Sequence, residues 1–126
     1  MLKGATTIWE NWNGIDDDGV PRDSFNHYLM GSVVGWLFSH VAGIRPLEPG
    51  YAKILIRPLP GGSFSWVSCS YRSASGMIRS SWKRSGDEFN LVIEVPVEAT
   101  VHLPDGTVHE VEKGAHEFLC RLKDID

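Results

Sequence analysis

Residues 76–95 read GMIRSSWKRSGDEFNLVIEV, and this stretch decides the fold class. Its second part, residues 89–95, alternates between side chains that suit a buried face and side chains that suit an exposed one. A Ser-Gly-Asp connection at 85–87 separates this part from another strand-like run at 76–84. Two such runs on either side of a short glycine-containing turn indicate neighbouring antiparallel strands.

Further strand-like runs lie on both sides of this stretch, at 53–57, 64–71, 99–103, 107–111 and 115–120, and Gly, Pro or Asp separate them. No helical pattern lies between them. We therefore predict a mainly β fold, an antiparallel sandwich or barrel, rather than a parallel βαβ sheet. Trp66, Tyr71 and Trp82 could form an aromatic platform for sugars, but alternating strand positions favour the sandwich core for them.

The chain changes character around residues 43–50. Before this boundary, apolar residues recur at steps of three and four from Phe25 to Val41, which predicts a helix that is apolar over most of its girth. Asp23 and Ser24 are candidate N-caps, and Gly43 is the predicted stop. Such a helix needs cover on several sides, and the front segment cannot close a core of its own. We therefore expect the chain to be the tail of a larger protein whose N-terminus is missing.

Composition excludes several classes of function. The 126 residues carry a net charge of −4 and no basic stripe, so nucleic acid is not an expected partner. No apolar run is long enough to span a bilayer, so no membrane partner is expected. Cys69 and Cys120 lack a C-x-x-C spacing; we expect free thiols, with one disulfide as the alternative.

We predict no metal and no cofactor. The five histidines show no zinc-ligand spacing with each other or with the cysteines. Residues 16–18 are three aspartates in a turn-rich loop, but the later ligand positions of an EF-hand are lacking. A solvated loop is the preferred interpretation of this acidic run.

The candidate catalytic stretch is residues 6–12, TTIWENW, which holds Glu10 between Trp9 and Trp12. An indole face packs against the apolar C–H face of a pyranose, and a carboxylate handles protons or hydroxyl groups. Apolar surroundings can also bring a carboxylate toward general acid or base chemistry at working pH. The alternative is an aromatic cluster in which Glu10 caps or pairs with a neighbour.

This stretch, together with SFNHY at 24–28 and WL at 36–37, resembles the end of the catalytic domain of bacterial α-L-rhamnosidases, glycoside hydrolase family 78. VAGI at 41–44, PGY at 49–51, ILIRP at 54–58, GMIRSSW at 76–82 and VHLPDG at 101–106 are similar to the passage into that family's C-terminal domain and to that domain itself. The resemblance covers nearly the whole chain. It implies two parts: residues 1–45 as the last, incomplete elements of an (α/α)₆ catalytic barrel, and residues 46–126 as a β-sandwich of jelly-roll type.

The resemblance also implies a function. The family removes terminal α-L-rhamnose with inversion, and its general base, the glutamate of the W-E-x-W motif, corresponds to Glu10. His27 corresponds to a histidine that contacts the sugar hydroxyls, and Trp9 and Trp12 would be wall or support residues. The general acid lies upstream of this chain, so the chain by itself is expected to be inactive. Its partners would be a rhamnose-containing glycoside and the remainder of its own barrel, with self-association of the isolated chain through its uncovered apolar face.

Two other functions remain open at this stage. One is a non-catalytic carbohydrate-binding β-sandwich with an N-terminal extension, and the other is a purely structural domain. An almost all-round apolar helix favours the severed barrel, because a binding module has no need of one. The natural substrate and the compartment, cytoplasm or periplasm, are left undetermined.

Overall fold

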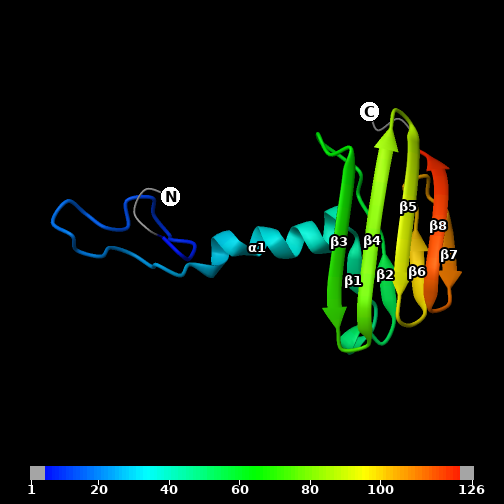
Figure 1. Ribbon diagram of the computed structural model, residues 1–126, viewed down its shortest axis with the longest axis horizontal. Helices are drawn as coiled ribbons and strands as arrows, with labels where there is room; N and C mark the ends of the chain where they lie inside the picture. The colour runs from blue at the N-terminus through cyan, green and yellow to red at the C-terminus, as the bar shows by residue number, and fades with distance from the viewer. Residues whose placement is uncertain (1–4, 123–126) are drawn as a thin grey trace. The chain divides into compact units, whose positions relative to one another are not determined.

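The computed structural model describes residues 5–122 of the chain. Contacts divide the chain into two compact units, one ending at Gly35 and one beginning at Trp36. Each unit is described by itself (Figure 1).

The second unit is a sandwich of two four-stranded sheets, which confirms the predicted mainly β fold. One sheet has the order β1-β2-β6-β7, made of β1 (Ile44–Pro46), β2 (Ile54–Ile56), β6 (Ala99–His102) and β7 (Val108–Val111). The other has the order β3-β4-β5-β8, made of β3 (Trp66–Ser73), β4 (Gly76–Ser85), β5 (Glu88–Val95) and β8 (Gly114–Arg121). Figure 1 shows the two sheets as two layers. A 3₁₀ turn, Pro49–Tyr51, lies between β1 and β2.

Seven of these strands fall on predicted runs, and the hairpin of β4 and β5 pairs as expected, with Ser85 opposite Glu88. The sequence did not predict β1, and one pairing departs from the antiparallel expectation, because β2 and β6 run parallel. Between them the chain forms three strands of the other sheet, so no tight hairpin dictates their relative direction.

The core lies between the sheets and follows the alternation of the strands. In β5 the buried residues are Phe89, Leu91, Ile93 and Val95, and the intervening residues are more exposed. Side chains from β1, β2, β4 and β6 complete a single cluster of buried residues. The cluster consists of Val41, Ile44, Ile54, Ile56, Ile78, Trp82, Phe89, Leu91, Ile93, Val95, Ala99, Val101 and Leu103.

The three aromatic residues expected in the core have different positions. Trp82 is fully buried, as predicted. Trp66 is 63% exposed, so the prediction of a core position is wrong for it. Tyr71 lies at the sandwich margin, where its ring contacts Tyr51 and Phe38. Positions 66 and 71 are an odd number of residues apart in one strand, so their side chains lie on opposite faces.

The sandwich is tied to the end of the preceding helix through main-chain carbonyls. Helix α1 (Tyr28–Trp36) continues into a π-helical turn, Leu37–Val41, which closes with a bond from the Ala42 N–H to the Leu37 carbonyl. The last carbonyls of a helix have no partner within it. Here donors from the sandwich reach four consecutive carbonyls at the helix end: Arg45 Nε to Ser39 (2.6 Å), Leu59 N–H to His40 (3.0 Å), Trp82 Nε1 to Val41 (2.8 Å) and Ser80 Oγ to Ala42 (2.8 Å).

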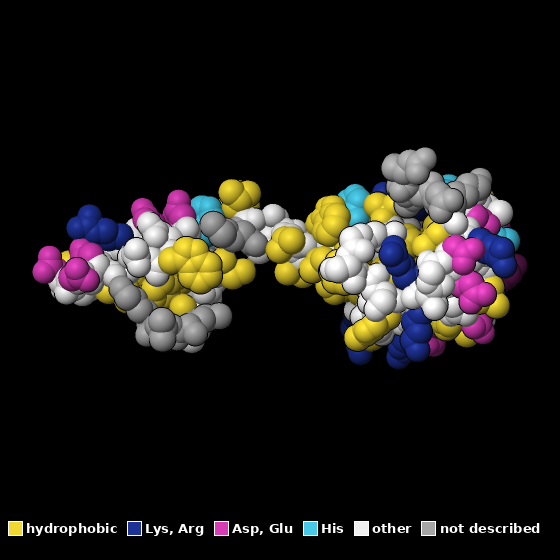
Figure 2. Space-filling view, turned by 90° about the horizontal axis from the view of Figure 1, so that it is seen from above, with side chains coloured by type: hydrophobic (Ala, Val, Ile, Leu, Met, Phe, Trp, Pro, Cys, Tyr) yellow, Lys and Arg dark blue, Asp and Glu magenta, His cyan; other side chains and the backbone are white. Residues whose placement is uncertain are grey.

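The first unit holds two irregular segments and α1. The predicted helix start at Asp23 or Ser24 is wrong, because α1 begins at Tyr28. Asp23 has a positive φ of 59°, and residues 24–27 pair with residues 8–10 rather than with the next helical turn. Along α1 the hydrophobic side chains are largely exposed (Figure 2): Tyr28, Leu29, Val33, Val34 and Trp36. Within residues 5–122, no helix has both the length and the apolar character that crossing a membrane requires.

Candidate active site

The candidate site is built on two segments that pair backbone to backbone. The Glu10 N–H donates to the Ser24 carbonyl (2.8 Å), and the His27 N–H donates to the Ile8 carbonyl (2.8 Å). These two bonds place residue 10 directly across from the SFNHY segment. The two motifs that the sequence singled out are therefore neighbours in the structure, although 17 positions separate Glu10 from His27 (27 − 10).

Glu10 and His27 form the polar centre of this site. Glu10 Oε2 accepts a hydrogen bond from the Ser24 backbone N–H (3.1 Å) and lies 3.5 Å from His27 Nδ1. The Glu10 side chain is 45% exposed and the His27 side chain 27% exposed. The carboxylate is thus held from one side while it remains open to water, and the imidazole's other ring nitrogen, Nε2, is available to a second partner.

The two tryptophans that flank Glu10 lie in different surroundings. Trp9 stacks on Phe25 with ring centroids 4.5 Å apart and planes 13° from parallel. The two rings close over Gly14, where an added Cβ would lie 2.9 Å from Trp9 and 3.0 Å from Phe25. Trp12 is 96% exposed. Trp9 therefore holds the segment in place, whereas Trp12 presents its indole to solvent.

Sequence reasoning missed the supporting residues of this site. Phe25 was assigned to the helix face, but it is the stacking partner of Trp9, and its carbonyl accepts the Thr7 hydroxyl. The Ser24 N–H that holds Glu10 was read as part of a helix N-cap. No local signal identified this stack, because Trp9 and Phe25 lie 16 positions apart in the sequence, on either side of Gly14.

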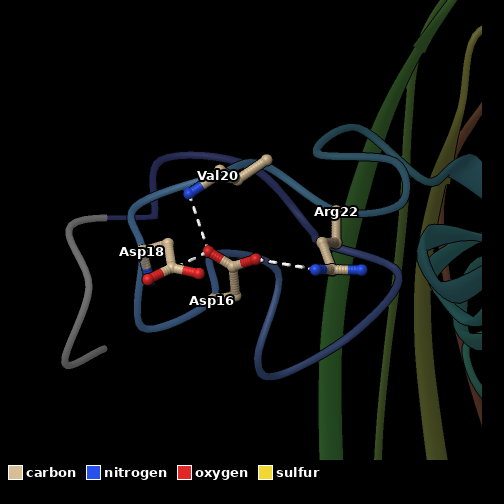
Figure 3. Close-up of polar contacts among 4 residues, drawn as sticks. All are labelled: Asp16, Asp18, Val20 and Arg22. Atoms are coloured by element: carbon tan, nitrogen blue, oxygen red, sulfur yellow. Dashed lines mark hydrogen bonds and ion pairs between the residues drawn. The ribbon is translucent and has the colours of Figure 1, made fainter.

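The acidic loop of the first unit is closed by its first aspartate (Figure 3). Asp16 Oδ1 accepts the backbone N–H groups of Asp18 (3.1 Å) and Val20 (2.8 Å), and Oδ2 pairs with both Nε and a terminal nitrogen of Arg22 at 2.9 Å. This carboxylate is therefore engaged in shaping its own loop. Among residues 5–122, no three His, Cys, Asp or Glu side chains gather as metal ligands would.

Two family profiles match the chain in succession. Residues 1–41 match the six-hairpin glycosidase domain of bacterial α-L-rhamnosidases, and residues 43–117 match the α-L-rhamnosidase C-terminal domain. Sequence relatives agree with this. An α-L-rhamnosidase of Streptomyces avermitilis is 34% identical over 92% of this chain, and one of Formosa agariphila is 32% identical over 80%.

Solved structures give the same result. The crystal structure of the Streptomyces avermitilis α-L-rhamnosidase complexed with L-rhamnose matches 95% of this chain with a TM-score of 0.78 and 33% identity. That of the native α-L-rhamnosidase from Aspergillus terreus matches 97% with a TM-score of 0.78 and 35% identity. The chain covers only 14% and 15% of those two chains, and 14% and 11% of the Streptomyces and Formosa sequences.

Proposed function

This chain belongs to the bacterial α-L-rhamnosidase family, and on that premise we propose that it completes an enzyme that removes terminal α-L-rhamnose from glycosides with inversion. In this proposal residues 1–45 are the last elements of an (α/α)₆ catalytic barrel and residues 46–126 a structural sandwich of jelly-roll type. The change of matched profile between residues 41 and 43 supports a boundary in this region. The exposed apolar side chains of α1 support a missing barrel, because they need cover.

The observation that carries the proposal is the Glu10–His27 pair. An inverting glycosidase needs a carboxylate base that activates a water on the far side of the sugar from a carboxylic acid, with the two carboxyl groups roughly 6.5–9.5 Å apart. Glu10 is suited to the base, because the Ser24 N–H fixes one of its oxygens while the side chain stays open to water. The acid would come from the remainder of the barrel.

His27, Trp12 and Trp9 have supporting roles in this proposal. His27 lies beside Glu10, so its imidazole would bind a sugar hydroxyl next to the reacting water. The exposed indole of Trp12 would form a wall for the C–H face of the ring, and Trp9 would support the loop through its stack on Phe25. That the Streptomyces relative was crystallised with L-rhamnose is consistent with this choice of sugar.

The test is hydrolysis of an aryl α-L-rhamnoside by a chimera in which this chain replaces the matching segment of the Streptomyces avermitilis enzyme. We expect the chimera to be active, the 126-residue chain alone to be inactive, and Glu10→Gln in the chimera to lower kcat about 10²–10⁴-fold, the usual range for loss of an acid–base residue. The matched control is Glu48→Gln, an exposed glutamate in the second unit.

Each outcome has a definite meaning. A Glu10→Gln chimera that unfolds at the same temperature as the unsubstituted chimera and turns over normally would exclude Glu10 as the base. Activity of the 126-residue chain alone would exclude the view that the acid lies elsewhere. An equal loss of kcat with Glu48→Gln would mean that the loss is not specific to Glu10.

A further inference from the structure

The outward face of the sheet β3-β4-β5-β8 has a composition that a structural sandwich does not require. On this face the strand register aligns two rows of side chains across the sheet. One row is Trp66, Lys83, Asn90 and Leu119, and the next is Ser68, Ser81, Val92 and Glu117. Trp66 is the exposed indole that the alternation had been expected to bury.

This face is hollowed. A depression of about 610 Å³ is lined by Trp66, Ser68, Ser81, Lys83, Asn90 and Val92, together with Val67 and Trp82. A second of about 360 Å³ adjoins it, and Trp66, Lys83 and Asn90 line both. The two depressions therefore form a trough with an indole at the point where they meet, on strands that lie side by side in Figure 1.

The trough combines apolar and hydrogen-bonding surface in a way that suits a sugar. The Trp66 indole and the exposed Val92 and Leu119 side chains offer apolar contact. The Ser68 and Ser81 hydroxyls lie 3.0 Å apart, and each can still bond a ligand hydroxyl.

Asn90 adds a polar group whose orientation is fixed. Its Nδ2 donates to Glu117 Oε1 at 2.7 Å, which leaves the amide oxygen as an acceptor toward a ligand. A side chain held in this way loses little rotamer freedom when it binds, so it favours a ligand with hydroxyl groups in matching positions.

The charges favour a neutral ligand. Lys83 and Arg84 are positive and Glu88 is negative among the residues that line the trough. Arg79 and Glu94, on the next row of this face, neutralise each other in an ion pair. Charges of both signs give no field that would select a polyanion or a polycation.

We propose that the outward face of β3-β4-β5 is a carbohydrate-binding site for a neutral oligosaccharide, with Trp66 stacking on one pyranose and Ser68, Ser81, Lys83 and Asn90 bonding its hydroxyls. This site is separate from Glu10, and it does not rest on the proposed hydrolysis. The adjoining depressions indicate that it takes at least two linked sugar units.

The test uses the 126-residue chain labelled with ¹⁵N and titrated with neutral oligosaccharides: a rhamnose disaccharide, cellohexaose and maltohexaose. We expect at least one to cause saturable shifts of the Trp66 indole N–H and of outward amides in β3–β5. Trp66→Ala should weaken binding at least about tenfold, which corresponds to the loss of a stacking contact. Trp36→Ala, which removes another exposed indole, on α1, should leave the affinity unchanged.

Asn90→Ala serves as the second variant, because it alters a side chain that lines both depressions and leaves the buried face of β5 intact. It should weaken binding, while the strand amides of the variant without ligand keep the chemical shifts that they have in the natural sequence. The proposal is overturned if none of the oligosaccharides gives saturable shifts, if the shifts are confined to residues 5–35, or if Trp66→Ala binds as well as the natural sequence. None of these results bears on hydrolysis by the chimera, so the two proposals fail independently.

Discussion

At residue 43 the chain has room for no side chain. Gly43 has a φ of 80°, and a Cβ added there would lie 2.2 Å from the Pro58 nitrogen and 2.7 Å from the Arg57 carbonyl oxygen. Its own carbonyl accepts the Arg57 N–H at 2.8 Å. The turn from the helix into β1 is therefore locked against the end of β2 by close backbone contact, which only glycine allows.

We expect Gly43→Ala to destabilise the sandwich by more than about 1–2 kcal/mol, the approximate cost of the left-handed backbone alone, because the clash adds to it. Urea unfolding followed by tryptophan fluorescence measures the change in the free energy of unfolding. Gly61→Ala is the matched control, since an added Cβ meets nothing within 4 Å there and its φ is not positive. Equal urea concentrations at the midpoint of unfolding for Gly43→Ala and Gly61→Ala would contradict this account of Gly43.

At the scale of the strands, the register keeps the two cysteines apart. Cys69 lies on β3 and Cys120 on β8, the two edges of one four-stranded sheet. Three inter-strand spacings separate those edges, about 14 Å, which is far beyond the reach of a disulfide. Both are free thiols in the structure, as the sequence had favoured.

Burial raises the pKa of both thiols, with Asp105 as a lesser influence on Cys120. Because the pKa of each thiol is higher in the folded state, its contribution to the free energy of unfolding is fully present below the ordinary thiol pKa. That contribution is lost as pH rises through the raised value. We therefore expect both thiols to react more slowly with an aromatic disulfide at pH 8 in the folded chain than in urea, because less thiolate is present. Cys69→Ala and Cys120→Ala assign the rates, and equal folded and unfolded rates at any one site would contradict the prediction there.

How much the sequence could predict also depends on the kind of element. Seven strands were predictable because period-two alternation and Gly or Pro turns are local signals. The strand β1 was missed, since three residues ending in a proline carry no alternation. The start of α1 was misplaced because residues 24–27 bond to residues 8–10, a non-local choice that overrides capping preference.

The candidate site was predictable only in part for the same reason. The motif identified Glu10 and His27, and the structure brings them to 3.5 Å. The support of Trp9 by Phe25 and of Glu10 by the Ser24 N–H depends on segments 14 to 16 positions apart, and no local pattern encodes it. Trp66 was assigned to the core together with Tyr71, although their odd separation in one strand places the two side chains on opposite faces.

At the scale of the whole molecule, the two units differ in how well they bury their apolar residues. The sandwich has a continuous core, whereas the side chains of α1 are largely exposed. We expect amides of β4 and β5 to exchange slowly with deuterium and amides of residues 5–35 to exchange fast at low protein concentration. At high concentration we expect self-association through α1, which would protect its amides.

Hydrogen exchange and sedimentation velocity at both concentrations measure these effects together. The variant Leu29→Glu/Val33→Glu should abolish self-association and leave exchange in the strands unchanged, because both residues lie on exposed parts of α1. Ser70→Glu, an exposed position on β3, is the charge control. Uniform protection of the whole chain in a monomer would contradict the picture of an uncovered front segment.

The bonds between the sandwich and the helix end have a practical consequence for anyone who wishes to isolate this module. A protein cut at residue 43, where the match to the C-terminal domain begins, would retain β1 to β8 but lose residues 39–42. The Ser80 hydroxyl and the Trp82 indole N–H would then be donors whose acceptors are gone, at a cost of about 1–3 kcal/mol for each that stays buried. A shortened protein that keeps these bonds must therefore begin upstream of Leu37, inside the region that matches the neighbouring glycosidase domain.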